Sequence, residues 1–324
     1  MSSQPLSPPL PSAEARAVPG YEDVAVLIPC LNEERTVGKV VRDFSAALKG
    51  ARILVFDNGS SDGTALAAER SGASVVHAHR RGKGNVVKQM FEQVDAELYV
   101  LVDGDDTYPA PEAQRLIAEF RKGGVDMVVG ARMVPDGVVA YRRFHRFGNR
   151  LISSLIAWLF SIEVTDVLSG YRVLSRQFVK SVPLESSGFE IETELTLQAA
   201  TKGLASREVP IEYRPRPHGS VSKLNTFSDG FLVLKAIFII CKDYKPLLFF
   251  SCLSVALALA SLAAGARPIL GYLETGLVHH LPTAVLATGT AILAALSLCI
   301  GLILDTLAKY HNENIQLFRR LMKK

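Results

Sequence analysis

Two long apolar runs near the C-terminal end set the strongest limit on how this 324-residue chain can fold. Residues 246–266 contain no charged side chain, and neither do residues 281–304. Each run approaches the ~20 residues that an α-helix needs to cross a ~30 Å hydrocarbon core. Two such runs in succession are a poor match for the core helices of a soluble protein. We therefore predict membrane spans over residues 247–265 and 282–304.

Basic residues flank these runs unequally. The loop between the runs contributes only Arg267, whereas several cations stand outside them: Lys242, Lys245, Lys309, Arg319, Arg320, Lys323 and Lys324. Because loops rich in Lys and Arg stay on the cytoplasmic side, residues 246–305 are predicted to form a transmembrane hairpin with both ends inside. The chain is thus expected to be a multi-pass inner-membrane protein with a cytoplasmic body and a basic tail over residues 306–324.

Composition excludes several classes of protein. Lys and Arg total 36 against 32 for Asp and Glu, so a net charge of +4 gives no reason to expect a nucleic-acid partner. The four cysteines share no CxxC spacing, which argues against a disulfide framework or a structural zinc site. Residues 1–20 contain five prolines and no apolar signal-peptide core, and they are predicted to be a disordered lead.

The body of the chain alternates short β-branched runs with helical patterns. This alternation predicts βαβ units and a mostly parallel sheet, hence an α/β fold. The expected strands are residues 24–29, 52–57, 74–78, 97–103 and 126–131, with helices near 34–48, 62–71, 84–95 and 111–122. Polar clusters follow three of the strands, and ligands of such sheets bind beyond the carboxyl ends of the strands.

Two shorter segments are amphipathic. Residues 151–160 and 227–241 are too short, or too interrupted by Lys235, to span a membrane. We expect both to lie in the membrane interface, with residues 226–245 as one interfacial unit and Trp158 near the headgroups. For residues 151–160, an ordinary core helix explains the pattern equally well.

An acidic pair follows the strand run ELYVLVD. Asp103 and Asp105 stand two residues apart on a turn, where both carboxylates can point to one place. Carboxylate oxygens are the hard ligands that Mg²⁺ and Mn²⁺ prefer, and these cations bind diphosphates. A lone DxD is common, so the weight of this pair comes from its position after a buried strand.

Three other turns accompany the acidic pair. Residues 29–34 (PCLNEE) follow the first strand, and residues 57–64 (DNGSSDGT) follow the second. Residues 80–84 (RRGKG) are basic and glycine-rich at a helix start, where backbone amides and the helix dipole suit a phosphate. This segment lacks the spacing of a Walker A loop, and no GxGxxG is present, which disfavours a dinucleotide oxidoreductase.

The motifs IPCLNEE, FDNGSSDGT, RGKG, VDGDDTYP and GAR, in this order, resemble a family 2 glycosyltransferase with the GT-A fold. The resemblance covers roughly residues 24–225, and the glycosyltransferase domain is expected over 21–225. Residues 166–172 (DVLSGYR), 188–192 (GFEIE) and 216–223 (RPHGSVSK) are similar to polyprenyl-phosphate glycosyltransferases such as dolichyl-phosphate glucose and mannose synthases.

The resemblance assigns roles to individual residues. Donor binding falls to Pro29, Leu31, Glu33, Asp57, Lys83 and Asp103. Asp103 and Asp105 would hold Mg²⁺ or Mn²⁺, and Asp105 and Asp166 would be the catalytic carboxylates. Binding of the acceptor and of phosphate falls to Arg132, Arg146, Arg172, Arg216 and Lys223. Asn58 replaces the commoner second Asp of its motif, and Thr107 stands where mannose synthases often carry Gln.

These residues imply inverting transfer of a sugar from a nucleotide-diphosphate sugar to a polyprenyl phosphate of the undecaprenyl or dolichyl type. The pattern from Asp166 to Arg172 favours UDP-glucose as donor, with UDP-GlcNAc and GDP-mannose open. Asp166 is either a base or a residue that orients the sugar. The spans are compatible with a homo-oligomer.

Two other functions compete with this one. A processive polysaccharide synthase shares the GT-A core but resembles chains with a QxxRW motif. The only tryptophan, Trp158, follows Leu-Ile-Ala, so this motif is absent and the synthase is disfavoured. A glycosyltransferase-like membrane scaffold without catalysis needs neither the acidic pair nor the basic residues assigned to phosphate binding. A nucleotide diphosphate with Mn²⁺ should raise the melting temperature of an enzyme but not that of such a scaffold.

Overall fold

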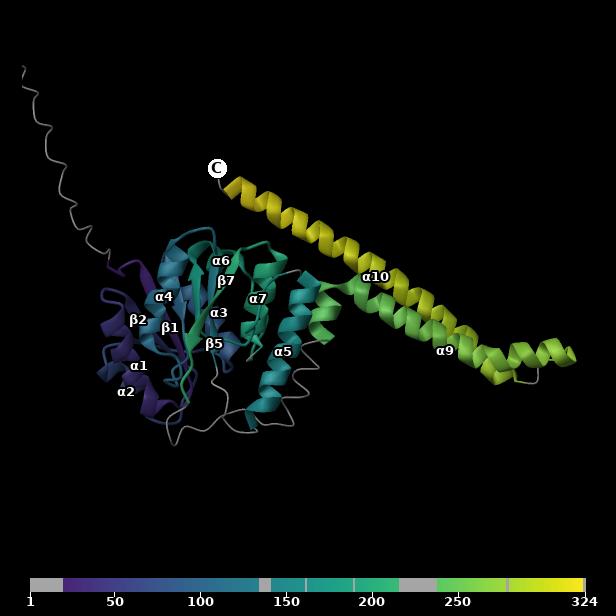
Figure 1. The fold of residues 1–324 in the computed structure, drawn as a ribbon, viewed down its shortest axis with the longest axis horizontal. Helices are drawn as coiled ribbons and strands as arrows, with labels where there is room; N and C mark the ends of the chain where they lie inside the picture. The colour runs from purple at the N-terminus through teal and green to yellow at the C-terminus, as the bar shows by residue number, and fades with distance from the viewer. Residues whose placement is uncertain are drawn as a thin grey trace, which may run out of the picture.

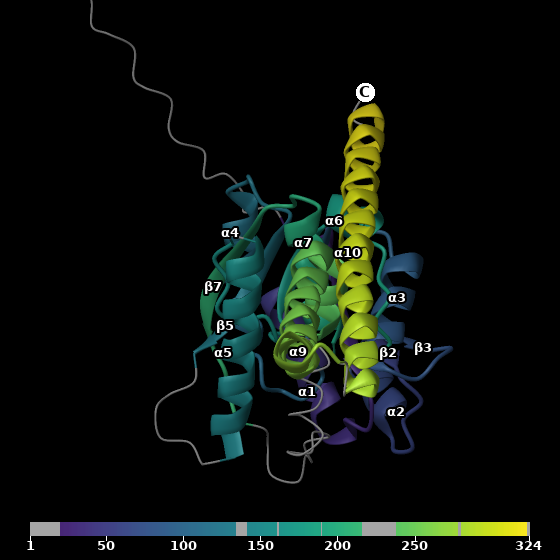
Figure 2. The same cartoon turned by 90° about the vertical axis from the view of Figure 1, so that its right-hand side faces the viewer.

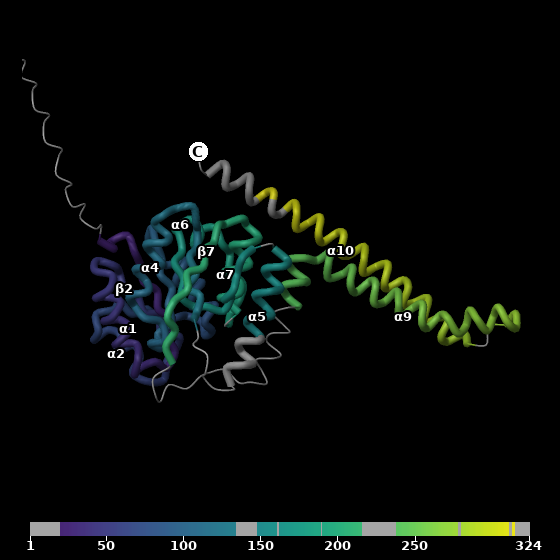
Figure 3. Tube along the Cα trace, in the orientation of Figure 1, coloured from purple at the N-terminus to yellow at the C-terminus, as the bar shows by residue number. Residues whose placement is uncertain are grey.

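A computed structural model describes residues 20–133, 141–160, 162–188, 190–215, 238–277 and 280–322. The chain forms an α/β domain from which a pair of long helices projects (Figure 1). Followed along the chain, this helical pair comes last, after every strand of the sheet (Figure 3).

The domain is built on a seven-stranded sheet in the order β3-β2-β1-β4-β6-β5-β7. Its strands are β1 (Val24–Cys30), β2 (Arg52–Asp57), β3 (Ser74–His77), β4 (Leu98–Leu101), β5 (Met127–Met133), β6 (Arg172–Ser175) and β7 (Ser206–Glu212). Only β6 runs antiparallel to its neighbours, β4 and β5. The carboxyl ends of the other six strands therefore meet at one edge of the sheet, which we call the carboxyl edge.

Helices cover both faces of the sheet. One face packs on α1 (Glu34–Ala47), α2 (Thr64–Arg70) and α4 (Ala110–Arg121). The other packs on α3 (Lys83–Gln93), α6 (Arg176–Ser181) and α7 (Ile191–Thr201). In β1 the side chains alternate between the two cores, because Val26 joins one cluster and Leu27 the other. Burial of each such side chain contributes about 1.5–3 kcal/mol.

The predicted α/β class is confirmed, and the sheet is mixed rather than wholly parallel. The five expected strands and four expected helices are present with ends shifted by up to two residues. Strands β6 and β7 were not predicted. Strand β6 is antiparallel and lies outside the alternation of parallel strands and helices, and β7 includes Pro210 and is largely exposed.

Helix α5 (Tyr141–Phe160) lies outside the two layers and packs on α7 and on the π-helix η1 (Ile240–Tyr244). It is twenty residues long, twice the predicted segment. Ile152 and Ile156 are buried, whereas Trp158 is 68% exposed. The helix is thus amphipathic but seats its apolar face on protein, and its placement at a membrane interface stays a prediction. Most of the other predicted interfacial segment, residues 226–237, lies outside the described residues.

Helices α9 (Pro246–Thr275) and α10 (Leu281–Met322) form an antiparallel hairpin that covers both predicted spans (Figure 2). Each is long and apolar enough, by length and composition, to cross a membrane. Their most apolar windows are 0% and 17% buried, so they are not core helices of the domain. Three serine hydroxyls join them by donating to carbonyl oxygens of the opposite helix: Ser254 to Ala294, Ser261 to Ala287 and Ser297 to Phe250.

Candidate active site

The turns that follow β1, β2 and β3 are tied together at the carboxyl edge. The side-chain oxygen of Asn32 accepts from the Ser61 amide at 2.8 Å, and Asn32 itself has a positive φ of 52°. Asn58 is 7% exposed, and its side-chain oxygen accepts from the Gly82 amide at 3.1 Å. The Asn that departs from the family motif therefore holds the RGKG segment in place.

The acidic turn after β4 is held by its own hydrogen bonds. Asp105 is 3% exposed, and its Oδ1 accepts from the hydroxyl of Thr107 at 2.6 Å and from its amide at 3.2 Å. The Gly104 carbonyl accepts from Thr36 Oγ1 at 2.7 Å, which ties the turn to α1. Asp106 adopts a positive φ of 59°. Thr107, the second departure from the family pattern, thus stabilises the conformation of the turn.

Lys83 lies between two carboxylates. Its Nζ is 2.6 Å from Asp103 Oδ1 and 2.5 Å from Glu192 Oε1, and its side chain is only 12% exposed. Burial by itself lowers the pKa of Lys83, but the charges of Asp103 and Glu192 outweigh it and raise the pKa above its ordinary value. Lys83 is therefore a fixed cation beside the acidic turn.

The start of α3 packs tightly against the loop that precedes α7. The Gly84 amide donates to the Gly188 carbonyl at 3.1 Å. A Cβ at Gly82 or Gly84 would collide with the carbonyl oxygens of Ser187 or Ser186. The expectation that these amides cradle a phosphate does not fit this arrangement, because Gly82 and Gly84 already donate within the protein. The basic side chains of the segment, Lys83 among them, remain suited to a phosphate.

Arg132 and Asp166 form a buried bidentate pair at the end of β5. Nε and Nη2 of Arg132 each donate to Asp166 at 2.7 Å, and Asn149 adds a third side-chain donor at 3.0 Å. Burial raises the pKa of Asp166, but the bonds from Arg132 outweigh it, and the net shift is downward. The Arg132 guanidinium also lies over the Tyr213 ring, 5.4 Å from its centroid.

Asp166 is connected to the acidic turn by the short segment that ends at Gly170. A Cβ at Gly170 would lie 2.8 Å from Asp103 Oδ2, so only a glycine leaves this carboxylate in place. The Gly170 amide donates to the Tyr108 hydroxyl at 3.1 Å. The structure thus brings Asp103, Lys83, Arg132 and Asp166 to one region of the carboxyl edge.

Arg172, expected among the phosphate-binding residues, is 0% exposed. Its guanidinium donates to the carbonyls of Ser169, Val167 and Glu192 and to the Thr196 hydroxyl. Burial lowers the pKa of Arg172 to about 10. The expected phosphate contact does not fit this position, and Arg172 instead ties β6 to the start of α7.

The other expected residues are placed as follows. Asp57 is buried at the end of β2, while Pro29, Leu31 and Glu33 are partly exposed around the end of β1. All four lie at the carboxyl edge, as a donor site there requires. Arg216 and Lys223, and the side chain of Arg146, lie outside the described residues.

Sequence reasoning did not select Glu192. The signal was the alternation of Glu190, Glu192 and Glu194 before a helical pattern, which a helix N-terminus explains equally well. In the structure Glu190 is exposed, Glu194 accepts from the amides of Glu185 and Ser186, and Glu192 contacts Lys83.

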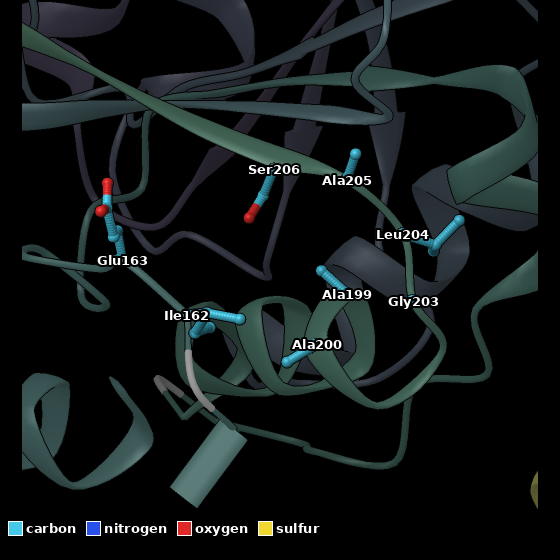
Figure 4. A pocket seen from close by; sticks show the side chains of 8 residues that line it. All are labelled: Ile162, Glu163, Ala199, Ala200, Gly203, Leu204, Ala205 and Ser206. Carbon is cyan, nitrogen blue, oxygen red and sulfur yellow. The ribbon is translucent and has the colours of Figure 1, made fainter. Parts of the chain in front are cut away.

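A shallow pocket lies at the opposite edge of the sheet, between the end of α7 and the start of β7 (Figure 4). Small and apolar side chains make up most of its lining, with Glu163 as its only charged residue. Its chemistry and position separate it from the carboxyl edge.

The acidic turn fits a divalent cation by the chemistry of its donors, since carboxylate oxygens suit Mg²⁺ and Mn²⁺. Asp103 already binds one positive charge, the ammonium of Lys83. Within the described residues no three His, Cys, Asp or Glu side chains gather as a complete metal shell. A cation held there would take its remaining ligands from a diphosphate or water.

The fold and the carboxyl-edge site define a glycosyltransferase of the GT-A type. The fold resembles the crystal structure of glucosyl-3-phosphoglycerate synthase from Mycobacterium tuberculosis in complex with Mn²⁺, uridine diphosphate and glucosyl-3-phosphoglycerate. The TM-score is 0.57 at 22% identity, over 68% of this chain and 78% of that one.

The family model Glycosyl transferase family 2 matches residues 25–182. Glycosyltransferase AglJ of Haloferax volcanii is 31% identical over 306 residues, which cover 94% of this chain and 100% of AglJ. A dolichyl-phosphate hexose transferase of the same organism is 30% identical over 226 residues, 69% of this chain and 96% of that protein. The chain belongs to glycosyl transferase family 2, which confirms the resemblance.

Proposed function

We propose that the chain transfers a sugar from a nucleotide-diphosphate sugar, with UDP-glucose as the favoured donor, to the phosphate of an undecaprenyl or dolichyl lipid. One observation carries the proposal: a glycosyltransferase site and two exposed apolar helices occur on the same chain. The similarity to a dolichyl-phosphate hexose transferase, which extends over 96% of that protein, supports a lipid-phosphate acceptor. The hairpin would hold the domain at the cytoplasmic face of the inner membrane.

The charge of the acceptor determines what the site must do. A phosphomonoester has a second pKa of about 6, so a polyprenyl phosphate is mostly a dianion near neutrality. It needs no strong base, but it must approach a negatively charged diphosphate. We assign Lys83 to the donor diphosphate, and Arg132 with Arg146, Arg216 and Lys223 to the acceptor phosphate. Pro29, Leu31, Glu33 and Asp57 would hold the base and ribose.

The proposed reaction is a direct displacement with inversion. An acceptor phosphate oxygen forms a bond to the anomeric carbon, and the bond from that carbon to the diphosphate breaks, with its electron pair going to the diphosphate. Asp103 and Asp105 would hold Mg²⁺ or Mn²⁺, which when bound neutralises charge on the diphosphate. We assign Asp166 to orienting Arg132 rather than to a base, because the bidentate pair lowers the pKa of Asp166.

The proposal is tested by incubating membranes that contain the full chain with labelled UDP-glucose, UDP-GlcNAc or GDP-mannose and with undecaprenyl or dolichyl phosphate. We expect label from UDP-glucose in the lipid extract, and none with the Asp103→Asn variant. Label in a polymer would favour a polysaccharide synthase. Absence of label from all three donors, with no Mn²⁺-dependent rise in melting temperature on adding UDP, would favour a scaffold.

A further inference from the structure

Two carboxylates of different exposure share the ammonium of Lys83. One ammonium contacts two carboxylates, Asp103 and Glu192, at 2.6 and 2.5 Å. The two carboxylates differ in exposure, because the Asp103 side chain is 27% exposed and the Glu192 side chain only 6%. Asp103 is therefore the partner that an incoming cation can reach, while Glu192 is shielded inside the protein.

Glu192 has a fixed position at the start of α7. Its backbone carbonyl accepts from Arg172 Nη2 at 2.8 Å, and the buried Arg172 is itself held by four other acceptors. The Gly84 amide bonds to Gly188, so the backbone beside Lys83 is tied to the same region. The distance between the backbones of Lys83 and Glu192 is thus set by the packing of α3 against α7.

One oxygen of Glu192 has no partner within the described part of the chain. Its Oε2 is buried and accepts no hydrogen bond, although Oε1 contacts Lys83. Leaving a buried carboxylate oxygen unpaired costs free energy. The contact with Lys83 offsets this cost, together with the nearby charge of the buried Arg172.

We propose that Glu192 is a positioning residue that retains the Lys83 ammonium when Asp103 turns from Lys83 to a divalent cation. This inference rests on the proposed function, since it assumes that Asp103 binds a metal in the working site. With Glu192 as its second partner, Lys83 leaves Asp103 without moving away from the acidic turn. The same ammonium is then available to the donor diphosphate, and Asp103 is available to the metal.

The experiment is a titration of the purified full-length protein with Mn²⁺ alone, in which free Mn²⁺ is measured by electron paramagnetic resonance. In Glu192→Gln the ammonium loses one of the two carboxylates that it contacts in the described structure, so it pairs more strongly with Asp103 and competes more strongly with Mn²⁺. We expect binding roughly tenfold weaker, the size of a strong pairwise coupling. Glu190→Gln removes the same charge from an exposed position nearby and should change the affinity less than about twofold.

A second background separates positioning from simple loss of negative charge. In Lys83→Met no ammonium competes for Asp103. Adding Glu192→Gln to this variant should therefore weaken Mn²⁺ binding only slightly, by a factor about five times smaller than the factor in the wild type. An equal loss in both backgrounds would overturn the proposal. If Glu192→Gln fails to fold, Glu192→Asp carries the test: it keeps the charge at a shorter reach, and we expect about threefold weaker binding, whereas unchanged binding would overturn the proposal.

The result also distinguishes this inference from the proposed function. Asp103→Asn should abolish Mn²⁺ binding. If Asp103 is required but Glu192→Gln binds as tightly as the wild type, the positioning role is wrong and the metal assignment stands. If Mn²⁺ binding is absent or independent of Asp103, the metal assignment fails and this inference fails with it.

Discussion

Lys83 and Arg132, two cations of the site, are held in different ways. Lys83 contacts two carboxylates with one charge, whereas Arg132 is matched to a single carboxylate by two parallel hydrogen bonds. A bidentate arginine–carboxylate pair is specific in geometry and strong. The comparison indicates that the Lys83 cluster is built to exchange partners on binding a ligand, while the pair of Arg132 and Asp166 is built to stay fixed.

The largest expected effect falls on the exchangeable cluster. Asp103→Asn removes the exposed carboxylate of the acidic turn, and we expect sugar transfer to lipid to fall roughly 10³-fold. The melting temperature should change little, because Asp103 is partly exposed. The measurement is the initial rate of label transfer with thermal unfolding as the control for folding. Transfer within threefold of wild type would remove the acidic turn from the mechanism.

The fixed pair should show its effect in stability. Asp166→Asn leaves the mostly buried Arg132 without its ionised partner, and we expect unfolding to require about 2 kcal/mol less free energy. Chemical denaturation of the full chain in detergent measures this change. Lys122→Gln, which breaks an exposed pair with Glu119, is the matched control and should cost less than about 1 kcal/mol. Equal losses would show that the Arg132 pair is no stronger than a surface pair.

The same pair predicts a pH dependence of stability. The pKa of Asp166 is lowered in the folded protein, so its contribution is fully present above the unfolded value of about 4 and is lost as the pH falls through the folded pKa. The difference in melting temperature between wild type and Asp166→Asn should therefore be constant from pH 7 to about 5 and shrink below pH 4. A difference that grows on acidification has the wrong sign for this pair.

A smaller effect is expected at Gly170, which lies between the Lys83 cluster and the pair of Arg132 and Asp166. In Gly170→Ala the new methyl group would lie 2.8 Å from Asp103 Oδ2, and the carboxylate must shift. We expect transfer to fall about tenfold, since small displacements of a catalytic group are costly. Gly289→Ala, whose Cβ would meet no other atom within 4 Å, is the control and should leave the rate unchanged. Equal rates for both variants would mean that the position of Asp103 tolerates displacement.

Most strands of the sheet were predictable because their sequences carry a clear strand pattern. Runs such as residues 24–29 are continuous and β-branched, and the polar turns follow them directly. The same alternation placed Asp103 and Lys83 at one edge, although only the fold shows that they touch.

Other features depend on long-range packing that the sequence does not display. An arginine is normally exposed, so the burial of Arg172 could be found only once carbonyls from several segments were seen to surround it. The choice of Glu192 among three alternating glutamates likewise depends on how α3 packs against α7. Strand β6 was missed because it is antiparallel and lies outside the alternation of parallel strands and helices that located the others.

The central claim is that a lipid phosphate is the group that attacks the sugar. Its most direct test is mass spectrometry of the lipids after the purified full chain, in nanodiscs, is given the active nucleotide sugar with either undecaprenyl phosphate or the corresponding alcohol. We expect a product heavier by one sugar residue from the phosphate and none from the alcohol. Equal product from both lipids would contradict it, as would sugar released only to water.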